Sequence, residues 1–250
     1  AITAALVTMV LGPAIIRWLR AKSLTQYIRG EGPGQHMAKE GTPTMGGLMI
    51  ILSILTAVLC WANLGNPYIK VMVFSLLGFG SIGFWDDYLK VSRKSSRGLK
   101  ARSKFGMQIL LALAIGVWLY LLDQKDPYVD VLSVPFFKKW LFDLGWFYIP
   151  FAAIVMVGAS NAVNLTDGID GLAIGLVAIA TLASGVLVYI SGHKGLASYL
   201  QVLYLAETGE LAVFCAAMFG AALGFLWYNS YPADVFMGDV GSIGLGGALG

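Results

Sequence analysis

Long apolar stretches separated by short polar segments run through this chain from end to end. Seven of them are long enough to cross a hydrocarbon layer roughly 30 Å thick as helices of about 20 residues. They lie near 2–19, 45–64, 68–88, 105–122, 147–163, 171–191 and 209–228, and an eighth begins near Ser242. The pattern predicts an all-α fold, a polytopic membrane helix bundle with about seven full spans and the start of an eighth.

The composition agrees with a protein embedded in the lipid bilayer. Hydrophobic residues make up 58% of the chain and charged residues 12%, and the mean hydropathy is +0.75. These values lie outside the range of water-soluble domains. Cys60 and Cys215 fall inside predicted spans, so we expect neither a disulfide nor a zinc site. We expect a single integral-membrane domain over residues 1–250 that is truncated at both termini.

The basic residues predict the orientation of the bundle, because Lys and Arg in short loops mark the cytoplasmic side. Segments 17–43 and 89–104 together hold 12 of the 17 basic residues. Counting spans from them places 164–170 and 229–241 on the same side. Segment 123–146 then lies on the other side, where VDVLSVPFF predicts a short strand pair around Pro135 and KKWLFDLGW an interfacial stretch.

Five aspartates stand at the ends of apolar runs, where an ionised carboxylate is costly. They are Asp86, Asp87, Asp167, Asp170 and Asp239. For the first two, in FWDDYLK, an alternative interpretation is that they only mark a membrane boundary. Two adjacent carboxylates at a C-terminal helix end, however, repel one another and oppose the helix dipole. Because adjacent residues on a helix point about 100° apart, we expect separate roles for them.

Two further segments combine acids with glycine turns. In NAVNLTDGIDGLA, amides and carboxylates within ten residues suit a nucleobase, a ribose or a hydrated metal, whereas helix capping explains one acid only. In WYNSYPADVFMGDVGS, Asp239 is either a helix cap or a group that meets a cation and phosphate at a helix start. The residues alone do not decide between two roles for Phe236, which are stacking on a flat ring and anchoring at the membrane interface.

The basic and hydroxyl residues on the predicted cytoplasmic side complete the pattern. Lys39 and Thr44, in AKEGTPTMGG, are candidates for contacts to phosphate, although Lys39 alone is typical of a topology-determining residue. The run from Lys90 to Lys104 predicts a surface that faces lipid headgroups and also attracts an anionic substrate. Aspartates, amides, glycine turns and lysines on one membrane face together predict a magnesium site for phosphate chemistry.

Four segments carry a resemblance to a known family. GTPTMGG, FWDDYLK, NAVNLTDGIDGLA and FMGDVGS, in order across positions 38–242, resemble the signatures of the phospho-N-acetylmuramoyl-pentapeptide-transferase (MraY) family. That family belongs to the polyprenyl-phosphate N-acetylhexosamine-1-phosphate transferase superfamily. The resemblance implies transfer of phospho-MurNAc-pentapeptide from UDP-MurNAc-pentapeptide to undecaprenyl phosphate. The products are lipid I and UMP, and the reaction is the first membrane step of peptidoglycan synthesis.

The resemblance also implies roles for individual residues. Asp86 and Asp87 match the family's paired catalytic aspartates, and Asp239 matches a catalytic aspartate that binds Mg²⁺. Positions around the nucleotide are matched by Asn164, Asp167, Gly168, Asp170, Asn229 and Phe236, the last placed to stack on uracil. Polar positions of the same cleft are matched by Lys39, Thr44 and Lys104.

The family context extends these expectations to location and completeness. The resemblance implies a bacterial cytoplasmic (inner) membrane protein with its active site on the cytoplasmic face and no nucleic-acid partner; a homodimer stays open. The family has ten spans and a histidine-rich motif near its C-terminus, so we expect this chain to lack both ends. Two alternative functions remain: a related transferase that uses another UDP-N-acetylhexosamine for surface polysaccharide and, more distantly, an ion-coupled transporter, whose acids would line a path to both faces.

Overall fold

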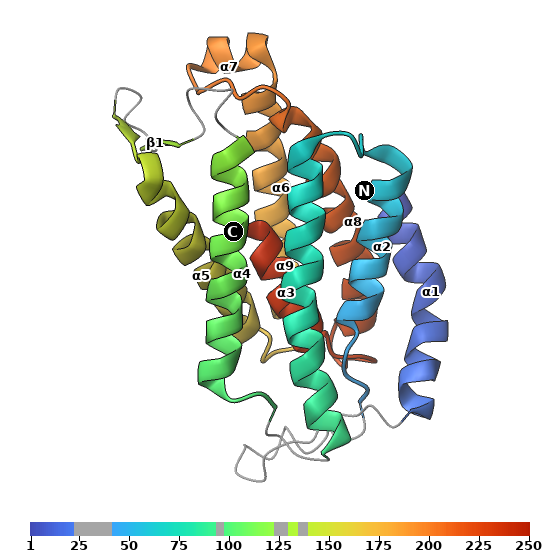
Figure 1. The fold of residues 1–250 in the computed structure, drawn as a ribbon. Helices are drawn as coiled ribbons and strands as arrows, with labels where there is room; N and C mark the ends of the chain where they lie inside the picture. The colour runs from blue at the N-terminus through green and yellow to red at the C-terminus, as the bar shows by residue number, and fades with distance from the viewer. Residues whose placement is uncertain (23–41, 94–97, 123–129, 135–139) are drawn as a thin grey trace.

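Long apolar helices run side by side along the length of the molecule (Figure 1). The computed structural model describes residues 1–22, 42–93, 98–122, 130–134 and 140–250. Its helices are α1 (Ile2–Ala21), α2 (Gly47–Trp61), α3 (Pro67–Ser92), α4 (Ala101–Leu122), α5 (Tyr148–Thr166), α6 (Leu172–Gly192), α7 (Lys194–Leu200), α8 (Leu211–Asn229) and α9 (Gly238–Leu249). Two 3-10 helices, η3 (Gly145–Phe147) and η4 (Thr208–Glu210), precede α5 and α8.

The predicted spans are present, with one difference in length. Six helical segments in the described part of the chain are long and apolar enough to cross a membrane. The span expected at 45–64 is shorter: α2 has 15 residues, or roughly 22 Å at about 1.5 Å per residue. It starts late because the backbone N–H groups of Gly46 and Gly47 donate to the carbonyls of Phe236 and Met237. The chain is an all-α, multi-pass membrane protein.

The predicted strand pair is confirmed at the end of the bundle that carries α7 (Figure 1). Strands β1 (Val131–Ser133) and β2 (Leu141–Asp143) are antiparallel, with Leu132 opposite Phe142. The second strand lies within KKWLFDLGW, which we expected to be interfacial, and Pro135 lies outside the described residues.

Helix α9 lies in the middle of the bundle and packs most extensively against α3 and α5 (Figure 1). Every residue from Val240 to Ala248 is buried. Val240 and Leu245 belong to a core formed largely by α1, α2, α6 and α8, whereas Ile243 belongs to a second core formed by α3, α4 and α5. Four glycines among these nine residues allow the close helix approach that packing within a bilayer requires.

One end of the bundle collects the segments that carry the candidate residues. Helices α3, α5 and α8 end there, and α4, α6 and α9 begin there, away from the strand pair and α7 (Figure 1). Helix α3 is set in register by Asn66, whose side chain accepts hydrogen bonds from Tyr68 and Ile69 just ahead of Pro67 at the first helical position. The 26 residues of α3 then carry Asp86 and Asp87 to this end.

Candidate metal and phosphate site

Three carboxylates from two helices meet at this end of the bundle. Asp86 and Asp87 lie near the end of α3, and Asp239 lies in the first turn of α9. One oxygen from each lies within 4.8 Å of the other two. The Asp86 and Asp87 side chains are only 4% exposed, and the Asp239 side chain is 16% exposed. Buried oxygens at this spacing can hold a hard divalent cation, which prefers carboxylate ligands.

Close packing of α3 against α9 creates this group. A Cβ atom on Gly83 would lie 2.0 Å from the Asp239 carbonyl oxygen, so only glycine permits this approach. Gly238 has a φ of +73°, and a Cβ there would lie 2.6 Å from Asp87 Oδ2 and 3.0 Å from Thr44 Oγ1. The glycine turn noted in the sequence is therefore required both by its left-handed backbone and by the surrounding side chains.

Each member of the aspartate pair uses one oxygen to hold the backbone. Asp86 Oδ1 accepts a hydrogen bond of 2.8 Å from the N–H of Leu99, and Asp87 Oδ2 accepts one of 3.1 Å from the N–H of Val240. The other oxygen of each carboxylate faces Lys90. The two side chains therefore converge, although their positions on the helix are offset.

Two lysines neutralise most of the acidic charge. Lys90 Nζ lies 2.6 Å from Asp86 Oδ2, 3.3 Å from Asp87 Oδ1 and 3.1 Å from Asp239 Oδ2. Lys104, from α4, lies 2.5 Å from Asp239 Oδ2 and 3.9 Å from Asp86 Oδ2. With all five groups ionised, three negative and two positive charges leave one net negative charge. A bound Mg²⁺ would change the sign to one net positive charge, which suits an anionic phosphate substrate.

Five of the six predicted nucleotide residues divide into two sets. Asp167 and Asn164 lie beside the acidic group: Asn164 Oδ1 accepts a hydrogen bond of 2.9 Å from Ser242 Oγ in α9. Burial, together with the negative charge of Asp239, raises the pKa of Asp167 to about 7. Gly168 follows at the exposed turn. These residues remain predictions as nucleotide contacts.

The second set holds the segment between α8 and α9 in place. Asn229 is buried; its Nδ2 donates to the Val235 carbonyl and its Oδ1 accepts from the Gly171 N–H. Asp170 Oδ2 accepts a hydrogen bond of 3.3 Å from the Ala233 N–H. Both side chains thus position the turn that leads to Asp239, and a contact to nucleotide from either one stays a prediction.

The remaining predicted residues come from the segment between α1 and α2 and from the turn before α9. Thr44 is buried next to Gly238. The Phe236 N–H donates to the Pro43 carbonyl at 2.8 Å, and its ring is half-buried. Lys39 lies outside the described residues. The backbone pairing of 43–47 with 236–237 therefore joins two of the four signature segments at the site.

Lys90 is the site residue that sequence reasoning did not single out. We assigned the whole run from Lys90 to Lys104 to a basic surface, and we predicted Asp239 alone as a metal ligand. A signal was present, because Lys90 follows Asp87 by three residues and Asp86 by four. Residues at these spacings are neighbours on a helix surface.

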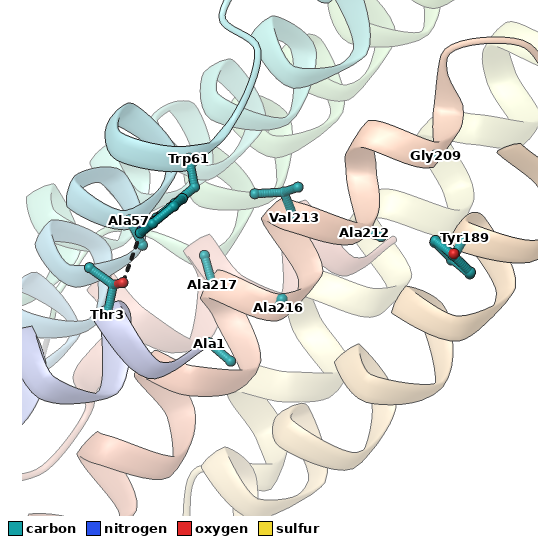
Figure 2. Close-up of a pocket in the computed structure, with 10 residues that line it drawn as sticks. All are labelled: Ala1, Thr3, Ala57, Trp61, Tyr189, Gly209, Ala212, Val213, Ala216 and Ala217. Carbon is teal, nitrogen blue, oxygen red and sulfur yellow. Dashed lines mark hydrogen bonds between the residues drawn. The ribbon is translucent and has the colours of Figure 1, made fainter.

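A pocket toward the opposite end of the bundle has different chemistry. It has a volume of about 390 Å³ and lies among α1, α2, α6 and α8 (Figure 2). Trp61 Nε1 donates a hydrogen bond to Thr3 Oγ1 across its rim. None of the ten described residues that line it has an acidic or basic side chain. This pocket does not suit a phosphate or a divalent cation.

Comparison with known proteins agrees with the four sequence segments. The chain matches glycosyl transferase family 4 over residues 69–250 and signature 1 of the phospho-N-acetylmuramoyl-pentapeptide-transferases over residues 39–51. It is 63% identical over 243 residues to the phospho-N-acetylmuramoyl-pentapeptide-transferase of Thermodesulfovibrio yellowstonii, covering 97% of this chain and 67% of that protein. The equivalent protein of Pelobacter propionicus is 55% identical, covering 100% of this chain and 69% of that protein.

Proposed function

The chain belongs to the phospho-N-acetylmuramoyl-pentapeptide-transferases of glycosyl transferase family 4, and we propose that it makes lipid I. In this reaction phospho-MurNAc-pentapeptide passes from UDP-MurNAc-pentapeptide to undecaprenyl phosphate, and UMP is released. The observation that carries the proposal is the convergence of Asp86, Asp87 and Asp239 with two lysines at one end of a membrane bundle. Such a site suits the neutralisation of a diphosphate.

The proposed chemistry is direct attack by the lipid phosphate. One of its oxygens forms a bond to the sugar-linked phosphorus while the bond from that phosphorus to the UMP oxygen breaks, and UMP leaves with the electron pair. Mg²⁺ held at Asp239, with Asp86 and Asp87 within reach, would neutralise charge on the diphosphate. A phosphate monoester has a second pKa of about 6, so the attacking oxygen needs little base catalysis.

The two-step alternative requires an aspartate as the nucleophile. The geometry favours direct attack because one oxygen of Asp86 and one of Asp87 each accept a hydrogen bond from a backbone N–H, and the other oxygen of each faces the positively charged centre of the site. Asp86 and Asp87 then orient the lipid phosphate and bind the cation. A phosphosugar trapped on the protein, with UMP released before lipid phosphate is added, would establish the two-step route instead.

The proposal also assigns an orientation to the protein. The described basic residues near the site, including Arg17, Arg20 and Arg93, lie at the end of the bundle that carries the acidic group. By the positive-inside rule, that end faces the cytoplasm of a bacterial cell and the bundle lies in its cytoplasmic membrane.

We take residues 1–250 as one domain because α9 contributes to both core clusters. A homodimer remains a prediction without structural support.

A donor comparison tests the function. The purified protein would receive undecaprenyl phosphate, Mg²⁺ and either UDP-MurNAc-pentapeptide or UDP-GlcNAc, with UMP release as the readout. We expect release from the first donor, its loss on chelation with EDTA and its return on adding Mg²⁺. Release from UDP-GlcNAc alone would show that the protein is a sister transferase for surface polysaccharide.

A further inference from the structure

The Lys90 ammonium lies at the point where the three carboxylates would hold a cation. Its nitrogen is 2.6 to 3.3 Å from one oxygen of each aspartate. Mg²⁺ binds oxygen at about 2.1 Å and requires near-octahedral geometry. An ammonium group and a metal ion cannot both occupy the space among the three carboxylates, because the space is too small for the two and their positive charges repel each other.

We propose that Lys90 is a resident counter-ion that competes with the divalent cation for the three carboxylates. In the metal-free site it screens the repulsion among Asp86, Asp87 and Asp239 and holds them together. When the metal binds, the ammonium leaves the carboxylates and turns toward the diphosphate of the bound donor. This inference rests on the proposed function, because it takes the acidic group as the metal site.

The surroundings of Lys90 allow this exchange. Its side chain is 32% exposed, whereas those of Asp86 and Asp87 are 4% exposed, so the lysine has an open side and the acids do not. Its flexible stem comes from the same helix one turn further on. Lys104 differs, because it comes from α4 and contacts mainly Asp239. The inference therefore concerns Lys90, which lies within 3.3 Å of one oxygen of each of the three carboxylates.

Competition of this kind couples metal binding to substrate binding. A lysine released from the carboxylates becomes a free cation beside the diphosphate, and a bound diphosphate in turn gives that lysine a new partner. The donor should therefore raise the affinity for metal, and the metal should raise the affinity for donor by the same factor. Lys90 is in this respect a positioning residue whose removal changes binding in a defined direction.

Metal binding without substrate tests the inference directly. Mn²⁺ binding to the purified protein would be measured by electron paramagnetic resonance for the wild type, Lys90→Met and Lys70→Met. Lys70 is exposed near the other end of α3, roughly 30 Å away at about 1.5 Å per residue. We expect Lys90→Met to bind Mn²⁺ at least about tenfold more tightly than the wild type, with Lys70→Met unchanged. Equal or weaker binding by Lys90→Met would overturn the inference, since a purely structural lysine gives that result.

Amine labelling of the unmodified protein gives an independent measurement that needs no variant. Lysines would be acylated with and without Mg²⁺ and quantified by peptide mass spectrometry. Release of Lys90 predicts faster labelling of that residue with Mg²⁺ and no change at Lys70; unchanged or slower labelling of Lys90 contradicts it.

The two proposals can fail separately. Lipid I formation together with equal Mn²⁺ affinity in wild type and Lys90→Met overturns the counter-ion role alone. The predicted gain in Mn²⁺ affinity without UMP release from UDP-MurNAc-pentapeptide supports the counter-ion role and overturns the function.

Discussion

Asp87 Oδ2 accepts a hydrogen bond from the backbone N–H of Val240 at 3.1 Å, which ties the end of α3 to the first turn of α9. The first N–H groups of a helix have no partner within that helix, and in the described structure the N-cap residue Met237 supplies no side-chain bond. Asp87 therefore caps α9 from a neighbouring helix. Its other oxygen faces Lys90, so its structural and chemical roles belong to different atoms.

This division predicts different outcomes for two substitutions of Asp87. Asn keeps an oxygen that can accept the Val240 N–H but removes the negative charge. We expect Asp87→Asn to unfold near the wild-type temperature while losing at least about 100-fold in UMP release. Asp87→Ala should lose the activity and, in addition, about 1 kcal/mol of stability, as for other lost helix caps. Thermal unfolding in detergent and the UMP assay separate the effects, and normal turnover by Asp87→Asn would exclude a chemical role.

The sequence predicted the bundle because membrane spans follow from the length of apolar runs alone. It did not predict the shortened start of α2, because that depends on backbone pairing between residues 46–47 and 236–237, nearly 200 positions apart. It grouped the aspartates correctly on one end of the bundle. Their shared counter-ion, Lys90, was hidden in a basic run whose other members mark topology.

Packing at Gly83 gives a second prediction. A methyl group there would overlap the carbonyl of Asp239, so Gly83→Ala must push α9 away from α3 and separate the carboxylates. We expect weaker Mn²⁺ binding and at least about tenfold lower turnover, in line with the cost of small misplacements at a site. Gly158→Ala is the matched control, because a Cβ there meets nothing within 4 Å. Equal Mn²⁺ affinity in the two variants would argue against α3–α9 packing as the determinant of the site.

Asn229 and Asp170 show a limit of reasoning from sequence. Their residue types suit a nucleotide, yet the structure shows both bonded to backbone groups near the turn before α9. Amide and carboxylate side chains use the same atoms to form hydrogen bonds with backbone groups of a loop and with a ligand. Which of the two they serve depends on the tertiary position of their partners, and the local patterns NAVNLTDGIDGLA and WYNSYPADVFMGDVGS do not contain that information.

The raised pKa of Asp167 gives a prediction about pH. In the folded protein this pKa rises from 3.8 to about 7, mainly because the group is buried and also because Asp239 is negatively charged. Folding therefore disfavours the ionised form, so stability from this group is intact at low pH and is lost as the pH rises toward 7. In metal-free protein, Asp167→Asn should be as stable as the wild type near pH 4. Its stability relative to the wild type should increase up to about pH 7 and stay constant at higher pH. Thermal unfolding across that range in detergent measures the difference; an advantage that is equal at all pH values would contradict the assignment.

Lys104 provides a prediction about substrate capture. It lies 2.5 Å from Asp239 Oδ2 and adds one of the two positive charges at the site, so Lys104→Gln leaves the metal-loaded group without its net positive charge. Attraction of an anionic donor then weakens, and we expect KM for UDP-MurNAc-pentapeptide to rise about tenfold and to depend less on salt than in the wild type. Lys194→Gln, exposed at the opposite end of the bundle, should leave both values unchanged. A lower kcat with an unchanged KM would instead indicate that Lys104 acts on the transferring phosphoryl group, because an interaction made only in the transition state changes kcat alone.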